Sequence, residues 1–215
     1  MYIPRHFAQT DHQAMWALIR SHPFAVLLTQ GPSGPVVDHL PFELTLSATG
    51  YGKLSGHVAR ANPMWRELSD EAESMAIFQG GQAYVSPSWY PSKQQTGRVV
   101  PTWNYRVVHA RGHLRVIQDK AWLFTHLQRL TDQMEAGFSK PWSLKQAPEG
   151  FIDGLVESVV GIEMEIQHLT GKWKLSQNRS IGDQVGVAAG LRKSAACEAE
   201  LLADAMIDNS SDMAN

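Results

Sequence analysis

The sequence predicts an α+β fold that is mainly β, a barrel or sandwich of strands with helices added on its outside. Roughly eight short strand-like segments follow one another closely, and a few helical segments lie between and after them. In the clearest strand, residues 159–169, Ile162, Met164 and Ile166 alternate with polar residues. The sequence contains no GxGxxG after a strand and no GxxxxGK[ST], which excludes two common nucleotide-binding motifs.

Composition narrows the class of protein. The 215 residues suffice for one large domain, or for one domain with a helical appendage. The formal charge is -2, whereas nucleic-acid-binding proteins usually carry a basic surplus. The single cysteine, Cys197, excludes an intrachain disulfide and fits a reducing compartment. We find no signal peptide and no membrane-length apolar run, so we expect a soluble cytoplasmic protein.

The first third of the chain predicts a helix and a hairpin. Thr10 and Gln13 match a capping box, an apolar face follows, and Pro23 ends the helix. Residues 24–29 and 36–45 are strand segments joined by a turn rich in glycine and proline, which is typical of a hairpin.

Residues 51–65 predict a strand that turns sharply into a helix. Asn62 is a good N-cap, and Pro63 suits the first helical position. Free backbone N–H groups at a helix start favour an anion. The segment is therefore either a phosphate cradle or a plain surface turn. The candidate phosphate contacts are Ser55, His57, Arg60 and Asn62.

The middle of the chain predicts strands around a loop. Residues 75–78 and 83–86 are two short strands bent at Gly80 and Gly81, and the polar residues 91–100 predict a mobile loop. The loop is bracketed by aromatic residues, which stack on a planar ligand or belong to the core. These residues are Trp89, Tyr90, Trp103 and Tyr105.

The second half of the chain alternates helices and strands. Residues 106–117 predict a strand with a bulge at Gly112, and Asp119 caps a helix that Gly137 ends. Ser180 and Asp183 resemble a capping box. We also expect a short helix at residues 149–157, a last strand at 172–177, helices at about 181–191 and 195–206, and a disordered end at 209–215.

A second basic segment lies at residues 171–180. Lys172 and Lys174 are two residues apart on a strand, so both side chains lie on one face. This segment either meets the first candidate around one ligand or is a solvated strand edge. Three polar residues follow the lysines, namely Ser176, Gln177 and Asn178. An anionic, planar, hydrogen-bonding ligand suits both segments, and flavin mononucleotide (FMN) fits that description.

Metal and catalytic patterns are weak. His109 and His113 are four apart on a strand, and no carboxylate stands at a ligand spacing from them. The sequence has no GxSxG elbow. We predict no metal site, and the catalytic residues, if any, are unknown.

Six motifs carry a family resemblance: MYIPRHF, DHLPF, LSGHVARANPMW, AYVSPSWY, VPTWNY and GKWKLSQNR. In this order they resemble the PaiB-like family of FMN-binding regulators, described as repressors of protease synthesis and sporulation. The resemblance implies a split β-barrel of the pyridoxamine-phosphate-oxidase type and a homodimer with FMN at the subunit interface. Residues 1–191 would form the FMN-binding domain, and residues 192–215 a helix with a disordered tail. Gly80-Gly81-Gln82 departs from the Gly-Pro expected at that turn.

The resemblance also implies roles for the candidate residues. Phosphate and ribityl contacts would come from Ser55, His57, Arg60, Asn62, Lys172, Lys174, Ser176, Gln177 and Asn178, the last five from the same subunit or from its partner. Trp103, Asn104 and Tyr105 would lie near the ring. Three functions stay open: a repressor, an FMN-dependent oxidoreductase acting on a small molecule, and a haem-binding protein. DNA binding rests on the resemblance alone.

Overall fold

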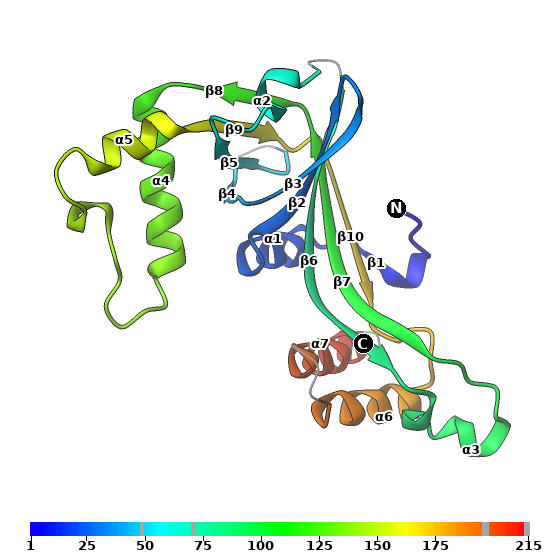
Figure 1. Cartoon of the computed structure of the whole chain (residues 1–215). Coiled ribbons are helices and arrows are strands. Elements are labelled where there is room, and N and C mark those ends of the chain that lie inside the picture. The colour runs from blue at the N-terminus through cyan, green and yellow to red at the C-terminus, as the bar shows by residue number, and fades with distance from the viewer. Residues whose placement is uncertain (48–49, 70–71, 195–197, 213–215) are drawn as a thin grey trace. The chain divides into compact units, whose positions relative to one another are not determined.

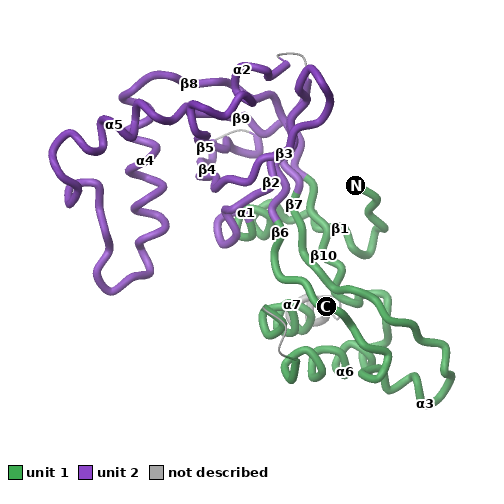
Figure 2. Tube along the Cα trace, in the orientation of Figure 1, with its two compact units in different colours: residues 1–18, 79–108, 170–215 green, residues 19–78, 109–169 purple. Residues whose placement is uncertain are grey.

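The computed structural model describes residues 1–47, 50–69, 72–194 and 198–212 of the chain. These residues divide into two compact units (Figure 2). Unit 1 comprises residues 1–18, 79–108 and 170–215, and unit 2 comprises residues 19–78 and 109–169.

Runs of strands and of helices follow one another along the chain (Figure 1). The strands are β1 (Ala8–Gln9), β2 (Phe24–Gly31), β3 (Gly34–Pro41), β4 (Glu43–Thr45), β5 (Lys53–Ala59), β6 (Ser74–Val85), β7 (Thr102–Gly112), β8 (Leu114–Ile117), β9 (Val159–Glu165) and β10 (His168–Lys174). The α-helices are α1 (His12–Ser21), α2 (Met64–Glu67), α3 (Ser92–Thr96), α4 (Lys120–Glu135), α5 (Phe151–Ser158), α6 (Ile181–Arg192) and α7 (Ala199–Asp212). The predicted α+β class is confirmed, because antiparallel sheets and helices both contribute.

Unit 2 is built around an antiparallel sheet with strand order β4-β5-β9-β8. The register places Leu54 of β5 and Leu114 of β8 on either side of Met164 of β9. The hairpin of β2 and β3 belongs to the same unit, and the first residues of β6 pair with β2. Asp119 caps α4 by accepting a hydrogen bond from the backbone N–H of Trp122 at 2.8 Å, as predicted.

One face of β9 is covered by α4. Gly161 of β9 lies so close to the ring of Trp122 that a Cβ atom there would collide with it. Side chains two residues apart on a strand share a face, so Glu163 lies on this same covered face. Residues 160–164 are therefore all buried, which the alternation of apolar and polar residues did not predict.

Unit 1 contains β1, β10, and the adjoining parts of β7 and β6, in that order, with α6 and α7. Ala8 of β1 pairs with Lys172 of β10. The two helices pack against each other, and Ser180 caps α6 by accepting from the N–H of Asp183, as predicted. The buried side chains of Leu191 and Leu202 belong to this helical layer.

Two predicted strands are one in the structure. The glycines at 80 and 81 do not bend the chain out of the sheet, because β6 runs unbroken from Ser74 to Val85. A Cβ atom on Gly81 would come within 3.1–3.3 Å of Glu198 and Leu202 at the start of α7. Gly81 thus gives α7 room to approach the strand. Conversely, the predicted strand 106–117 is two strands, β7 and β8, separated at His113.

The predicted mobile loop at residues 91–100 contains a helix. Ser92 begins α3 and donates from its N–H and its hydroxyl to the carboxylate of Asp183, at 3.1 and 2.8 Å. Gly97 ends the helix in the left-handed conformation, with φ 63°. Hydrogen bonds to Asp183, which is distant in the sequence, therefore order a segment whose composition predicted a mobile loop.

Helix ends also correct the sequence-based predictions. Asp11 caps α1, since its carboxylate accepts from the N–H groups of Gln13 and Ala14, whereas Thr10 was expected to do so. Residues 209–212 continue α7, and residues 213–215 lie outside the described residues. The expected helix at 195–206 begins at Ala199, with residues 195–197 outside the description.

Within the described part of the chain, none of the helices combines the length and the apolar character that crossing a lipid bilayer requires.

Candidate functional site

The predicted contacts divide between the two units. Unit 2 holds Ser55, His57, Arg60 and Asn62. Unit 1 holds Trp103, Asn104, Tyr105, Lys172, Lys174, Ser176, Gln177 and Asn178.

In unit 2, Arg60 is occupied by its own fold. Its Nε donates to the carbonyl of Glu157 at 2.7 Å, and its two terminal nitrogens donate to Gln118 Oε1 at 3.0 Å and to the carbonyl of Val159 at 2.9 Å. All three acceptors are neutral, so none of them offsets the positive charge of the guanidinium. These hydrogen bonds connect the end of β5 to the start of β9.

Asn62 has two structural partners. Its Oδ1 accepts from the N–H of Met64 at 2.9 Å, which caps the short helix α2, and its Nδ2 donates to Asp38 Oδ1 at 2.7 Å. Asn62 thus supports the start of α2, but the N-cap position belongs to Pro63, one residue later than predicted. The other carboxylate oxygen of Asp38 is buried, and no described residue hydrogen-bonds to it.

A cavity of about 410 Å³ lies beside these residues. Its volume is in the range of small-ligand sites. Polar groups come from Asp38, His57 and Asn62, and the apolar part includes Leu40 and Val58. The full lining is Asp38, His39, Leu40, Pro41, His57, Val58, Ala59, Asn62, Ser158 and Val159.

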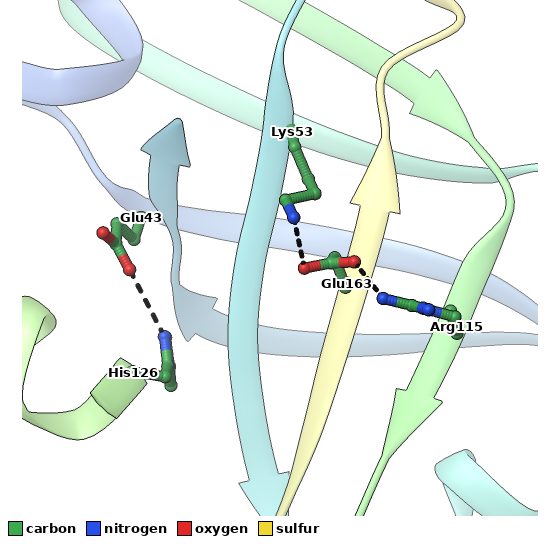
Figure 3. Close-up of polar contacts among 5 residues, drawn as sticks. All are labelled: Glu43, Lys53, Arg115, His126 and Glu163. Carbon is green, nitrogen blue, oxygen red and sulfur yellow. Dashed lines mark hydrogen bonds and ion pairs between the residues drawn. The ribbon is translucent and has the colours of Figure 1, made fainter. Parts of the chain in front are cut away.

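His57 continues into a buried cluster that sequence reasoning missed. Its Nδ1 is 3.1 Å from Nε2 of His126, whose ring stacks on Trp122 and is 2% exposed. Nδ1 of His126 is 3.6 Å from Oε2 of Glu43 (Figure 3). Burial, followed by the charges of His57 and Arg129, lowers the pKa of His126 to about 4, and burial also lowers the pKa of His57. Burial raises the pKa of Glu43.

The predicted contact Ser55 lines a smaller cavity of about 90 Å³ on this side of unit 2. Glu163 lies on the same cavity and binds two cations, with Lys53 Nζ at 2.8 Å and Arg115 Nη2 at 2.6 Å (Figure 3). Burial would raise the pKa of Glu163, but the hydrogen bonds from Lys53 and Arg115 hold it below the ordinary value. Glu43, His126 and Glu163 come from β4, α4 and β9, so no motif links them along the sequence.

In unit 1, the two lysines of β10 face aromatic rings. Lys172 is 9% exposed, donates to the carbonyl of Tyr2 at 3.1 Å, and lies 5.4 Å from the ring centre of Tyr105. Lys174 donates to Thr102 Oγ1 at 2.7 Å and to the carbonyl of Trp103 at 2.6 Å. Burial, followed by the charges of Lys172 and Arg179, lowers the pKa of Lys174.

Among the described residues, Lys172 and Lys174 have no carboxylate partner, whereas the charge of Arg179 acts on the Asp183 carboxylate. No carboxylate among the described residues forms an ion pair with Lys172, Lys174 or Arg179. An ammonium has three N–H donors, and neutral acceptors take only one from Lys172 and two from Lys174. The group therefore has both the charge and the remaining donors to bind an anion.

Three other predicted contacts are engaged in the fold of unit 1. The fully buried Asn104 donates to Ser176 Oγ at 3.0 Å and accepts from it at 3.2 Å. Ser176 adopts a left-handed backbone with φ 65°. Gln177 bonds back to Leu175 and Trp173 of the same turn. These side chains shape the turn after β10, and Asn178 beside them is exposed.

A groove of about 350 Å³ lies on the same unit, lined by Gln79, Gln82, Trp103, Tyr105 and Val107. Trp103 is 53% exposed, and its ring packs edge-on against Tyr84. Tyr105 belongs both to the groove and to the surroundings of Lys172. The donor set fits FMN: cations for a phosphate, aromatic faces for a planar ring, and two amides for a polar ring edge.

Comparison with known proteins shows which family the chain matches. Residues 1–168 match a family model described as "Putative FMN-binding domain". The chain belongs to this FMN-binding domain family. The match spans most of the chain and contains five of the six motifs; the sixth, at residues 171–179, lies beyond it. Together with the relatives below, the match confirms the family resemblance.

Two relatives align over most of their length. "Uncharacterized protein AN0679" of Emericella nidulans is 33% identical, over 88% of this chain and 90% of its own. "Protease synthase and sporulation protein PAI 2" of Bacillus subtilis is 28% identical, over 97% of both chains. Among solved structures, the flavocytochrome Anf3 of Azotobacter vinelandii superposes with a TM-score of 0.60 at 16% identity, over 80% of this chain and 72% of its own. This likeness supports the split-barrel fold that the resemblance implies.

Proposed function

We propose that this member of the FMN-binding domain family holds FMN on unit 1 and acts as a flavin-dependent regulator of the PaiB type. The observation that carries the proposal is the group of cations Lys172, Lys174 and Arg179, which forms no ion pair with a carboxylate among the described residues and adjoins an aromatic groove.

The cation group suits the phosphate of FMN. Hydrogen bonds between ammonium groups and phosphate oxygens are charge-assisted and stronger than neutral ones. Burial and mutual repulsion make the protonated form of Lys174 costly, and a bound dianion would relieve both. Phosphate binding should therefore raise the pKa of Lys174.

The groove suits the flavin ring. Trp103 and Tyr105 are two residues apart on β7 and share one face of the strand. Gln79 and Gln82 bring amide groups that match the hydrogen-bonding edge of the ring. Because Trp103 is half exposed, a ring stacked on it would remain open on one side.

Titration of the apo-protein with FMN and with riboflavin, which lacks the phosphate, tests the site. Lys174→Met should weaken FMN binding by about 10-fold or more and abolish the preference for FMN over riboflavin. Trp103→Ala should weaken both ligands alike. Lys120→Met, which removes an exposed lysine paired with Glu157, is the matched control and should leave both affinities unchanged. An unaltered FMN preference in Lys174→Met would refute phosphate binding by this group.

The regulatory role is supported by PAI 2, whose name refers to protease synthesis and sporulation and which aligns over 97% of both chains. The formal charge of -2 means that any DNA contact must use a local basic surface. A promoter-fragment shift assay with and without FMN, at low and high salt, tests the role. A salt-sensitive shift that depends on FMN supports it, and no shift at low salt contradicts direct repression.

The predicted contacts of unit 2 are a separate part of the proposal. Arg60→Ala should weaken FMN binding, and equal affinity in that variant would sink the prediction for this residue. We also propose a homodimer with FMN at the subunit interface, as the resemblance implies. Sedimentation equilibrium with and without FMN tests it, and a monomer in both states would contradict it.

An FMN-dependent oxidoreductase is the second candidate, favoured by the exposure of Trp103, which would leave the flavin ring accessible to a small reactant. FMN-dependent oxidation of a nicotinamide dinucleotide would support it. The absorption spectrum of the isolated protein separates the haem alternative, because a Soret band identifies haem and a flavin spectrum does not contain one.

A further inference from the structure

Acidic residues are missing from two long segments of the chain that meet in unit 1. Residues 74–118 and 166–182 contain no aspartate or glutamate, although the chain has 21 of them. The two segments supply β7 and β10, which are neighbours in the sheet. The acidic residues of unit 1 stand instead at positions 11 and 183 and from 198 onward. The basic residues that the two segments place in unit 1 are Lys93, Arg98, Arg106, Lys172, Lys174 and Arg179.

Two of these cations lie on the outer surface, in the segment of residues 91–100 that contains α3. The segment connects the end of β6 to the start of β7 and lies at one end of unit 1 (Figure 1). Lys93 and Arg98 are both exposed. Among the described residues, no carboxylate forms an ion pair with either side chain. Their charges are therefore available to an external anion.

Hydrogen bonds order the backbone that presents these two cations. Ser92 binds the Asp183 carboxylate through its N–H and its hydroxyl, at 3.1 and 2.8 Å. Gly97, in the left-handed conformation, donates from its N–H to the carbonyl of Lys93 at 3.0 Å, and Arg98 follows directly. An ordered binding segment loses less conformational entropy when a partner binds than a mobile one does.

The positive charge continues from this segment into the end of unit 1. The guanidinium of Arg179 lies 4.9 Å from the ring centre of Tyr90, whose carbonyl accepts from the N–H of Lys93 at 3.1 Å. Arg179 in turn acts on the charge of Lys174. Asp183 belongs to the same region, but it is 4% exposed and binds Ser92, so the outward-facing charge of the segment is positive.

We propose that Lys93 and Arg98 bind the phosphates of duplex DNA, an inference that rests on the regulatory role proposed above. A chain with a formal charge of -2 must bind a polyanion through a local surface, and the acid-free end of unit 1 supplies one. Duplex DNA carries one negative charge per roughly 1.7 Å of its axis, which suits neighbouring cations on an ordered segment. Gln94 and Gln95, both exposed, add amide donors that phosphate oxygens accept.

Fluorescence anisotropy of a labelled duplex of mixed sequence, measured with the full-length protein over a range of salt concentrations, tests this surface. The slope of log K against log salt concentration changes by about 0.9 for each phosphate that the protein neutralises. Lys93→Gln/Arg98→Gln should therefore reduce the slope by about 2 and weaken binding at low salt by about 10-fold or more. Lys93→Arg/Arg98→Lys keeps both charges and should bind as the wild type does.

Lys140→Gln/Lys145→Gln is the matched control, because it removes the same charge from exposed lysines of unit 2 and should leave the slope unchanged. FMN should bind Lys93→Gln/Arg98→Gln with wild-type affinity, since neither residue belongs to the proposed flavin site. A wild-type slope in that variant would overturn this surface and leave the regulatory role standing. Absence of wild-type DNA binding at low salt would overturn both, and tighter binding of single-stranded RNA than of the duplex would overturn the assignment to DNA.

Discussion

Replacing Glu163 by glutamine tests the ion cluster at the centre of the β5-β9-β8 sheet. The Glu163 side chain is 7% exposed, and its two oxygens contact Lys53 at 2.8 Å and Arg115 at 2.6 Å. Glutamine has the same shape but offers one acceptor, so its amide NH₂ must face one of the cations. The variant therefore loses one hydrogen bond, keeps a weaker one from the other cation, and creates no cavity.

The expected loss in free energy of unfolding depends on how exposed the two cationic partners, Lys53 and Arg115, are. Breaking a fully buried ion pair costs about 3–5 kcal/mol. Here water can still reach the cations, because the side chains of Lys53 and Arg115 are 36% and 71% exposed. We expect the free energy of unfolding at pH 7 to fall by roughly 1–3 kcal/mol.

Urea unfolding measures this difference. Glu157→Gln is the control, since its ion pair with Lys120 is exposed on both sides and should contribute little to stability. The lowered pKa of Glu163 means that its contribution is present above the unfolded pKa of 4.5 and is lost as pH falls through the folded value. The gap between wild type and Glu163→Gln should therefore close in acid. Equal stability of the two proteins at pH 7 would refute the reasoning.

Three further predictions concern other parts of the fold. Asn104→Ala leaves the buried Ser176 hydroxyl unpaired and should lower the free energy of unfolding by about 1–3 kcal/mol, measured by urea denaturation. The pKa of His126 is lowered from 6.5 in the unfolded chain to about 4 in the folded protein. The unfolded chain therefore binds this proton more readily, and stability falls as the pH drops from 6.5 to 4. Thermal unfolding should show that wild type loses about 3 kcal/mol more than His126→Phe over this pH range. Gly161→Ala drives a methyl group into the Trp122 ring and should lower the free energy of unfolding by about 1–3 kcal/mol. Gly154→Ala, which has open space around it in α5, should raise the free energy of unfolding by up to about 1 kcal/mol in the same urea denaturation series. The reverse order of the two variants would contradict the packing described for β9.

Local signals predicted much of the fold. The caps at Asp119 and Ser180 and the strand that begins at Val159 depend on neighbouring residues, and the structure confirms them. The bend expected at the glycines of β6 failed because the reason for Gly81 is distant: α7 approaches the strand there. Composition likewise indicated a loose loop where Ser92 is bound by Asp183.

The candidate site was only partly accessible from sequence. The lysines of β10 could be found because they share one strand face at a spacing of two. Glu163 was assigned to the polar face of β9, and that face turned out to be covered by α4. His126 fell on the apolar face of its helix, and that was the one available signal that it is buried. Its pairing with His57 depends on tertiary packing, which no local pattern encodes.

The division of unit 1 into three chain segments affects how the protein is made. Unit 2 has all its residues once position 169 has been synthesised, and its sheet from β4 to β9 can close at that point. Unit 1 cannot, because β1 at Ala8 waits for Lys172 of β10, and the helices α6 and α7 come later still. Pairings that span so much of the chain form slowly. During synthesis, β1 and the part of β7 that lies next to β10 therefore stay without their final neighbours, so the nascent chain depends on its last segment for protection against aggregation.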